Sequence, residues 1–293
     1  DLYNYASLHS AVEVVEFNGV MSSFSGVNSN QAPHQSINLD SLKTAFQDSS
    51  ASDSNEVIAI LDTGVDWLHP SLGGKLKYSS EKGGTPNFDD DGNGLVDDSI
   101  GYDFFYVDNS PMDENGHGTH VTGLACGNGY NGVQGASISA KYMPVQVLDY
   151  LGYGTASVLA QGIEYAANNG ASIVNMSLGG SDSKVVRDAL VYANFYCDYL
   201  VAAAGNSTLP LPGGCAFPGM TFPAAYGFVM GVEAERYFSN FDPNGPVETH
   251  DVQNFYNYEL AAPGANMFSC LPINSNGQPR YGRLTGTSMA TPL

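Results

Sequence analysis

The sequence predicts an α/β fold in which a mostly parallel central sheet is flanked by helices. Residues 57–61 and 173–176 are short apolar runs rich in β-branched side chains, as expected of buried parallel strands. Residues 157–169 and 184–193 have helical periodicity and alternate with the apolar runs along the chain. Strands that alternate with helices form parallel sheets with right-handed crossovers, which is the basis of this prediction.

Before the first apolar run, the sequence predicts a strand and a linker. Residues 11–17 alternate roughly between apolar and polar side chains, as strands do. Residues 22–35 are rich in Ser, Asn and Gly, which is typical of a linker or a processing site. A short helix is expected over residues 37–46, ahead of the core strand. Further along the chain, residues 141–148 and 200–204 are also expected to form strands, which completes the set.

Three motifs carry side chains suited to catalysis. Asp62 follows the run 57–61, and open α/β sheets place their ligand chemistry at the carboxyl ends of such strands. His117 lies in a glycine-flanked loop that leads into a helix. Ser288 precedes Pro292, which fits only the first turn of a helix, so Ser288 is expected at a helix N-terminus. Unpaired N–H groups there favour a developing negative charge.

A serine hydroxyl becomes a strong nucleophile when a base takes its proton and a third group holds that base. The chain order Asp62, His117, Ser288 is the order found in subtilisin. With the motifs Asp62-Thr63-Gly64, His117-Gly118-Thr119-His120 and Gly286 to Pro292, the sequence resembles the subtilisin-like serine proteases (subtilases) over residues 31–293. The resemblance implies a three-layer subtilisin-like fold, a protein that is secreted or lies in a compartment of the secretory pathway, and hydrolysis of peptide bonds through an acyl-enzyme.

The resemblance also implies the remaining parts of the site. Asn206 matches the asparagine that stabilises the oxyanion in this family. Polypeptide substrates are expected to add as a strand between two edges and to fill a neutral pocket that prefers apolar or small side chains. The implied substrate-binding residues are Gly152, Tyr153, Gly154, Ser177, Leu178 and Gly179 at the two edges, with Ala203 and Gly205 in the pocket wall.

The family pattern divides the chain into two parts. Residues 1–30 resemble the tail of a pro-region and a linker, and such a pro-region would act as the protein's own inhibitor; an ordinary N-terminal strand remains the alternative. Residues 31–293 are expected to form the catalytic domain. Subtilases continue past the serine motif with further helices, whereas five residues follow Ser288 here. The C-terminal helices are therefore expected to be missing from this sequence.

An acidic loop at residues 89–98 predicts a structural calcium site. Oxygen ligands at Asp89, Asp91 and Asn93, followed by the turn residue Gly94, match the first positions of a calcium loop. The Leu95 carbonyl and Asp97 would complete the ligand set. The twelfth position is isoleucine rather than a bidentate glutamate, so the loop is at best a shortened form. A solvated acidic turn is the alternative.

Composition limits the other functions. Ten basic and 30 acidic residues give a formal charge of −20, which argues against binding to nucleic acid or anionic membranes. No apolar run approaches the length that spans a bilayer. Cys197 and Cys215 are candidates for a disulfide. The alternative to a protease is a non-catalytic, calcium-ordered binding module or a pseudoprotease.

Overall fold

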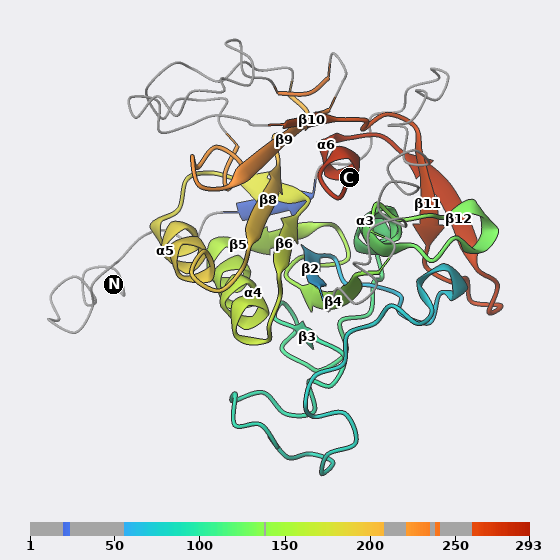
Figure 1. The fold of residues 1–293 in the computed structure, drawn as a ribbon, viewed down its shortest axis with the longest axis vertical. Coiled ribbons are helices and arrows are strands. Elements are labelled where there is room, and N and C mark those ends of the chain that lie inside the picture. The colour runs from blue at the N-terminus through green and yellow to red at the C-terminus, as the bar shows by residue number, and fades with distance from the viewer. Residues whose placement is uncertain (1–19, 24–55, 138, 208–220, 235–237, 241–259) are drawn as a thin grey trace, which may run out of the picture.

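A parallel sheet organises the domain, as the sequence predicts. The computed structural model describes residues 20–23, 56–137, 139–207, 221–234, 238–240 and 260–293. Seven strands lie in the order β10-β9-β8-β6-β2-β4-β3, and each adjacent pair is parallel (Figure 1). Their bounds are β2 Val57–Asp62, β3 Tyr102–Asp103, β4 Lys141–Gln146, β6 Ile173–Met176, β8 Tyr199–Ala203, β9 Met230–Ala234 and β10 Leu260–Ala262.

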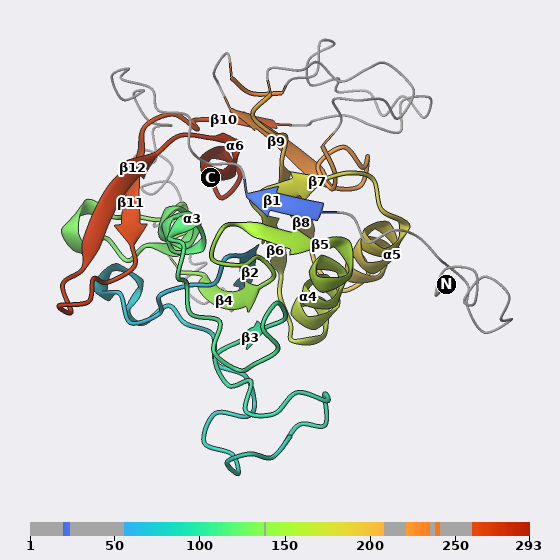
Figure 2. The ribbon, with the colours of Figure 1, turned by 180° about the vertical axis from the view of Figure 1, so that it is seen from behind.

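Helices cover both faces of this sheet, which gives three layers (Figures 1 and 2). Helices α4 (Ala156–Asn168) and α5 (Lys184–Ala193) lie on one face, and α3 (His117–Cys126) and α6 (Thr287–Ala290) lie on the other. Strand β2 shows why its sequence is apolar throughout. Its residues 57, 59 and 61 pack in the core under α4 and α5, whereas residues 58 and 60 pack under α3.

Two smaller sheets stand beside the main one. The hairpin of β11 (Met267–Leu271) and β12 (Arg280–Leu284) packs against α3. In the other sheet, β1 (Val20–Ser23) lies between β5 (Tyr153–Thr155) and β7 (Leu178–Gly180) and is antiparallel to both. Figure 2 shows β1 in blue between these two partners. The sequence did not predict a strand at β1, and the elements expected over 11–17 and 37–46 lie outside the described residues.

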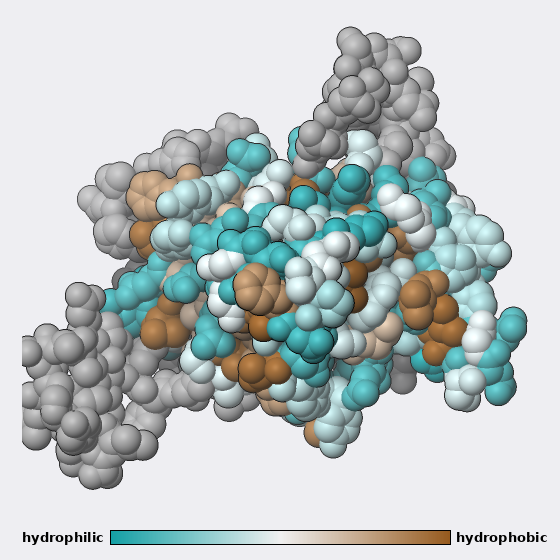
Figure 3. All heavy atoms as spheres, turned by 90° about the horizontal axis from the view of Figure 1, so that it is seen from below, coloured by the Kyte–Doolittle hydropathy of each residue, from teal (hydrophilic) through white to brown (hydrophobic). Residues whose placement is uncertain are grey.

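The acidic loop leaves the body of the domain before β3 and extends from the lower end of the molecule (Figures 1 and 2). Seen from below, the surface is mostly hydrophilic, and its apolar residues form separate small patches (Figure 3). Within the described part of the chain, no helix has both the length and the apolar character to cross a membrane.

Candidate active site

Asp62 and His117 form a buried pair where the carboxyl end of β2 meets the first turn of α3. His117 Nδ1 lies 2.7 Å from Asp62 Oδ1, and both side chains are almost fully buried. The Thr63 N–H also donates to Asp62 Oδ1, at 2.7 Å. A neutral imidazole whose Nδ1 donates to a carboxylate keeps Nε2 as its proton acceptor. His117 Nε2 is buried and has no hydrogen-bond partner among the described residues, so it is available as a base.

Ser288 is the second residue of α6, in line with its predicted place at a helix N-terminus. Helix α6 contacts α3, which carries His117. The Ser288 hydroxyl donates to the Ser177 carbonyl at 2.8 Å, and the Ser177 hydroxyl donates to the Ser288 carbonyl at 2.9 Å. These two bonds tie the serine motif to the end of β6. The structure thus joins Asp62 to His117 directly, while the Ser288 hydroxyl is bonded to Ser177.

Asn206 follows β8 and is anchored to the residue before Ser288. Its Oδ1 accepts hydrogen bonds from the Thr287 N–H at 2.9 Å and from the Thr287 hydroxyl at 3.1 Å. With Oδ1 held in this way, Nδ2 is the end of the amide that can donate to an oxyanion. Gly205 has a φ of +98°, and a Cβ there would lie 2.7 Å from Asn240 Nδ2 and 2.8 Å from Thr221 Oγ1. A side chain at 205 would therefore disturb the turn that presents Asn206.

The two predicted substrate-binding edges flank β1. Met21 lies opposite Gly154 on β5 and Gly180 on β7, and Ser22 lies opposite Tyr153 and Gly179. The Ser23 N–H donates to the Gly152 carbonyl at 3.1 Å. Met21 is 1% exposed and belongs to the core cluster that includes Leu178. These edges therefore hold an extended segment of the chain by strand pairing, while the alternate side chain of Met21 enters the apolar core.

Comparison with known proteins identifies the family. The sequence profile described as the subtilase family matches residues 53–293. The chain belongs to the subtilase family. It is 34% identical to thermitase of Thermoactinomyces vulgaris over 83% of this chain and 73% of the relative. It is 40% identical to a thermostable alkaline protease of Halalkalibacterium halodurans over 80% of this chain and 53% of the relative.

This subtilase chain spans about half the length of some of its relatives. The thermophilic serine proteinase of Bacillus sp. strain AK1 is 34% identical over 82% of this chain, and that match covers 50% of the relative. The major intracellular serine protease of Bacillus subtilis is 35% identical over 81% of this chain and 65% of its own length.

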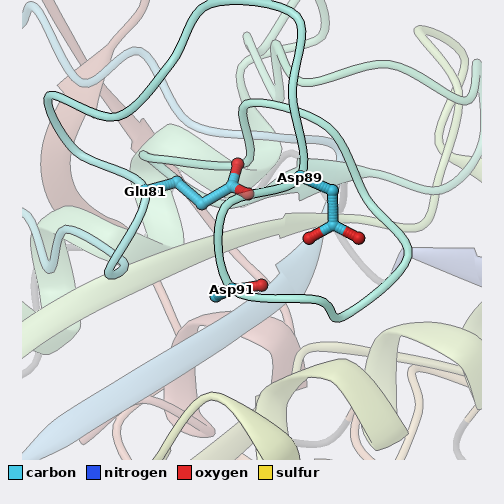
Figure 4. Close-up of side chains that lie close together, drawn as sticks. All are labelled: Glu81, Asp89 and Asp91. Atoms are coloured by element: carbon cyan, nitrogen blue, oxygen red, sulfur yellow. The ribbon is translucent and has the colours of Figure 1, made fainter.

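A group that could bind a metal ion joins the acidic loop of this subtilase to Glu81, which precedes the loop, so its members differ in part from those expected. Ligand atoms of Glu81, Asp89 and Asp91 all lie within 4.8 Å of one another (Figure 4). Glu81 is buried, and its carboxylate accepts backbone hydrogen bonds from Asp90 at 2.7 Å and Asp98 at 2.9 Å. A set of carboxylate oxygens suits a hard cation such as Ca²⁺.

Two of the five predicted ligands, Asn93 and Asp97, accept hydrogen bonds from nearby backbone N–H groups. Asn93 Oδ1 accepts from the Leu95 N–H at 2.7 Å, and Asn93 Nδ2 donates to Asp98 at 3.0 Å. Asp97 accepts from the Asn87 N–H at 2.8 Å. The spacing rule missed Glu81 because this residue precedes the motif by eight positions, and only the closing of the loop brings it to Asp89 and Asp91.

His120 and Cys197 are buried in the core of this subtilase, outside the Asp62–His117 pair. Burial lowers the pKa of His120 to about 3, helped by the nearby His117, so this imidazole is neutral; its Nε2 lies 3.1 Å from the Met267 carbonyl. Cys197 is a buried free thiol, and Cys215, the partner considered for it from the sequence, lies outside the described residues.

Proposed function

We propose that this chain is the catalytic part of a serine endopeptidase that hydrolyses peptide bonds with Asp62, His117 and Ser288. The buried 2.7 Å contact between Asp62 and His117, made beside the helix that bears Ser288, is the observation that carries the proposal. Membership of the subtilase family and relatives named as serine proteases support it.

The chemistry follows from these positions. His117 Nε2 accepts the hydroxyl proton of Ser288 while Ser288 Oγ bonds to the carbonyl carbon of the substrate. Asp62 holds the imidazole and stabilises its protonated form. The Ser288 N–H and Asn206 Nδ2 would donate to the oxyanion. His117 then gives the proton to the leaving amine as the peptide bond breaks, and water hydrolyses the acyl-enzyme by the same route.

The first step requires the Ser288 hydroxyl to turn from the Ser177 carbonyl to His117 Nε2. Catalytic hydrogen bonds are often long or misaligned without substrate and tighten in the complex. A substrate strand that donates an N–H to the Ser177 carbonyl would compete with the hydroxyl for this acceptor. Substrate binding would thus favour the productive orientation of the nucleophile.

Peptide hydrolysis and labelling by a serine-directed fluorophosphonate test the proposal on the full-length protein. We expect labelling and turnover in the wild type and neither in Ser288→Ala. If the wild type is not labelled, and Ser288→Ala matches it in a hydrolysis assay, the proposal fails. A non-catalytic binding module would then be the better description.

We also infer that the segment containing β1 acts as an inhibitor that occupies the cleft as a substrate would. The pairing of β1 with both edges and the burial of Met21 support this role. The same contacts favour substrates with an apolar side chain at the position of Met21. This role is the one expected of the tail of a pro-region. The proposal is based on the contacts of residues 20–23 alone.

Calcium is the cation that we propose for Glu81, Asp89 and Asp91. Three carboxylates so close together repel one another unless a cation neutralises them. Bound calcium would contribute structure rather than chemistry by fixing the loop between η1 (Pro70–Leu72) and β3. Secretion stays a prediction from the family resemblance, since one relative is named as intracellular.

A further inference from the structure

Asp113 is a buried carboxylate that the proposed reaction does not use. It lies four residues before His117, in the turn that leads into α3, and it is 3% exposed. Burial raises the pKa of Asp113, and hydrogen bonds from Gly116, Thr119 and Thr63 counter part of that rise. A carboxyl group in such surroundings is costly to bury unless its oxygens are well bonded.

Five donors surround its two oxygens. Asp113 Oδ1 accepts from the Thr63 hydroxyl at 2.9 Å, the Asn115 N–H at 2.9 Å and the Gly116 N–H at 2.8 Å. Oδ2 accepts from the Thr119 N–H at 2.8 Å and the Thr119 hydroxyl at 2.6 Å. One carboxylate therefore holds the start of α3 and the residue that follows Asp62, although Thr63 is 50 positions away in the sequence.

Thr63 extends the network to Asp62 and to Gly118, the residue after His117. Its N–H donates to Asp62 Oδ1 at 2.7 Å, and its hydroxyl accepts from the Gly118 N–H at 3.0 Å. The two segments are also in close backbone contact, because a Cβ at Gly118 would lie 2.1 Å from the Gly64 carbonyl oxygen. Asp113 and Thr63 thus connect the strand end that carries Asp62 to the helix turn that carries His117.

We propose that Asp113 is a positioning residue for the proposed triad: through Thr63 and Thr119 its carboxylate sets the placement of His117 against Asp62. The inference rests on the proposed protease function. An asparagine cannot replace Asp113, because its NH₂ group would face N–H donors on either side of the amide. The contact between Asp62 and His117 would then loosen, and small misplacements of catalytic groups cost up to about 100-fold in rate.

The test compares Thr63→Val and Asp113→Asn with the matched control Thr122→Val in the full-length protein. Thr122 lies in α3, the helix that carries His117, and is fully buried. Among the described residues its hydroxyl bonds only the Gly118 carbonyl, at 2.7 Å, and the valine variant loses this hydroxyl. Peptide hydrolysis is measured per active site, counted by fluorophosphonate labelling, so that a fall in the folded fraction does not affect kcat. Substrate binds at the β5 and β7 edges, which these changes do not touch.

We expect Thr63→Val and Asp113→Asn each to lower kcat by about 10- to 100-fold with KM within about twofold. Thr122→Val should stay within about twofold of the wild type in both. Because Thr63 and Asp113 share one bond, the double variant should lose less than the product of the single losses. If Asp113→Asn does not fold, Thr63→Val against Thr122→Val decides alone.

Two outcomes overturn the inference in different ways. If the wild type hydrolyses peptides and Thr63→Val equals Thr122→Val in kcat per active site, Asp113 has no positioning role, while the protease function stands. If the wild type is neither labelled nor active, the proposed function fails and the inference fails with it.

Discussion

Met21 gives a quantitative test of the proposal that β1 blocks the two predicted substrate-binding edges. Its side chain is 1% exposed and packs in the core cluster beside the β7 edge. Full burial of a methionine side chain is worth about 2 kcal/mol, and each 1.4 kcal/mol is tenfold in an equilibrium. Met21→Ala should therefore weaken the docking of β1 by about 30-fold, whereas Met21→Leu, which keeps the apolar volume, should change it little.

Docking is measured by competition in a Ser288→Ala background, which prevents self-cleavage. The probe is a fluorescent peptide that contains the sequence Val-Met-Ser-Ser of residues 20–23. Because β1 and the peptide compete for the same edges, the apparent Kd of the peptide should fall by up to about 30-fold in Met21→Ala. Met21→Leu should match the parent. Equal Kd values for all three proteins would refute the idea that Met21 holds β1 in the cleft.

Three further predictions follow from single groups. Asp62→Asn should lower kcat by about 10⁴-fold without unfolding the protein; a loss below tenfold in a peptide assay would contradict the role of the Asp62–His117 contact. Calcium at about 100 times its Kd should raise Tm by about 4 °C over chelator, and Glu81→Gln, but not Asp97→Asn, should remove the rise; an unchanged wild-type Tm would exclude the site. Burial raises the pKa of Asp103 from 3.8 to about 6, so the folded protein holds this proton more tightly than the unfolded chain and stability should fall as pH rises from about 4 to 6. Asp103→Asn can keep both bonds that Asp103 Oδ1 accepts, from Phe105 and Tyr106, and should lose this fall in denaturant titrations; an equal pH dependence would contradict the shift.

Four strands of the main sheet (β2, β4, β6 and β8) and the helices α4 and α5 were predictable because their signals are local, whereas β3, β9 and β10 were not predicted. The apolar run at β2 and the periodic segments of α4 and α5 carry their own patterns, and the structure has these elements within a residue or two of the expected bounds. The three-layer α/β architecture is confirmed by the parallel order of the seven strands. Two-residue β3 and three-residue β7 are too short to show any periodicity.

Contacts between distant segments were not predictable from spacing. Nothing in Val20–Ser23 shows that it pairs with residues more than 130 positions away, because strand register depends on the partner. Glu81 and Asp113 escaped for the same reason: their partners in the acidic loop and at Thr63 meet them only after folding. The contact between Asp62 and His117 was expected from the sequence because short motifs with glycine neighbours mark both residues.

The site of covalent attachment by a fluorophosphonate is the most direct test of the account. The full-length protein is treated with the probe, digested and sequenced by mass spectrometry, alongside His117→Ala. We predict one probe per chain, attached to Ser288, and no attachment in the variant that lacks the base. Attachment at another serine, or equal labelling of Ser288 in both proteins, would show that His117 does not activate this hydroxyl.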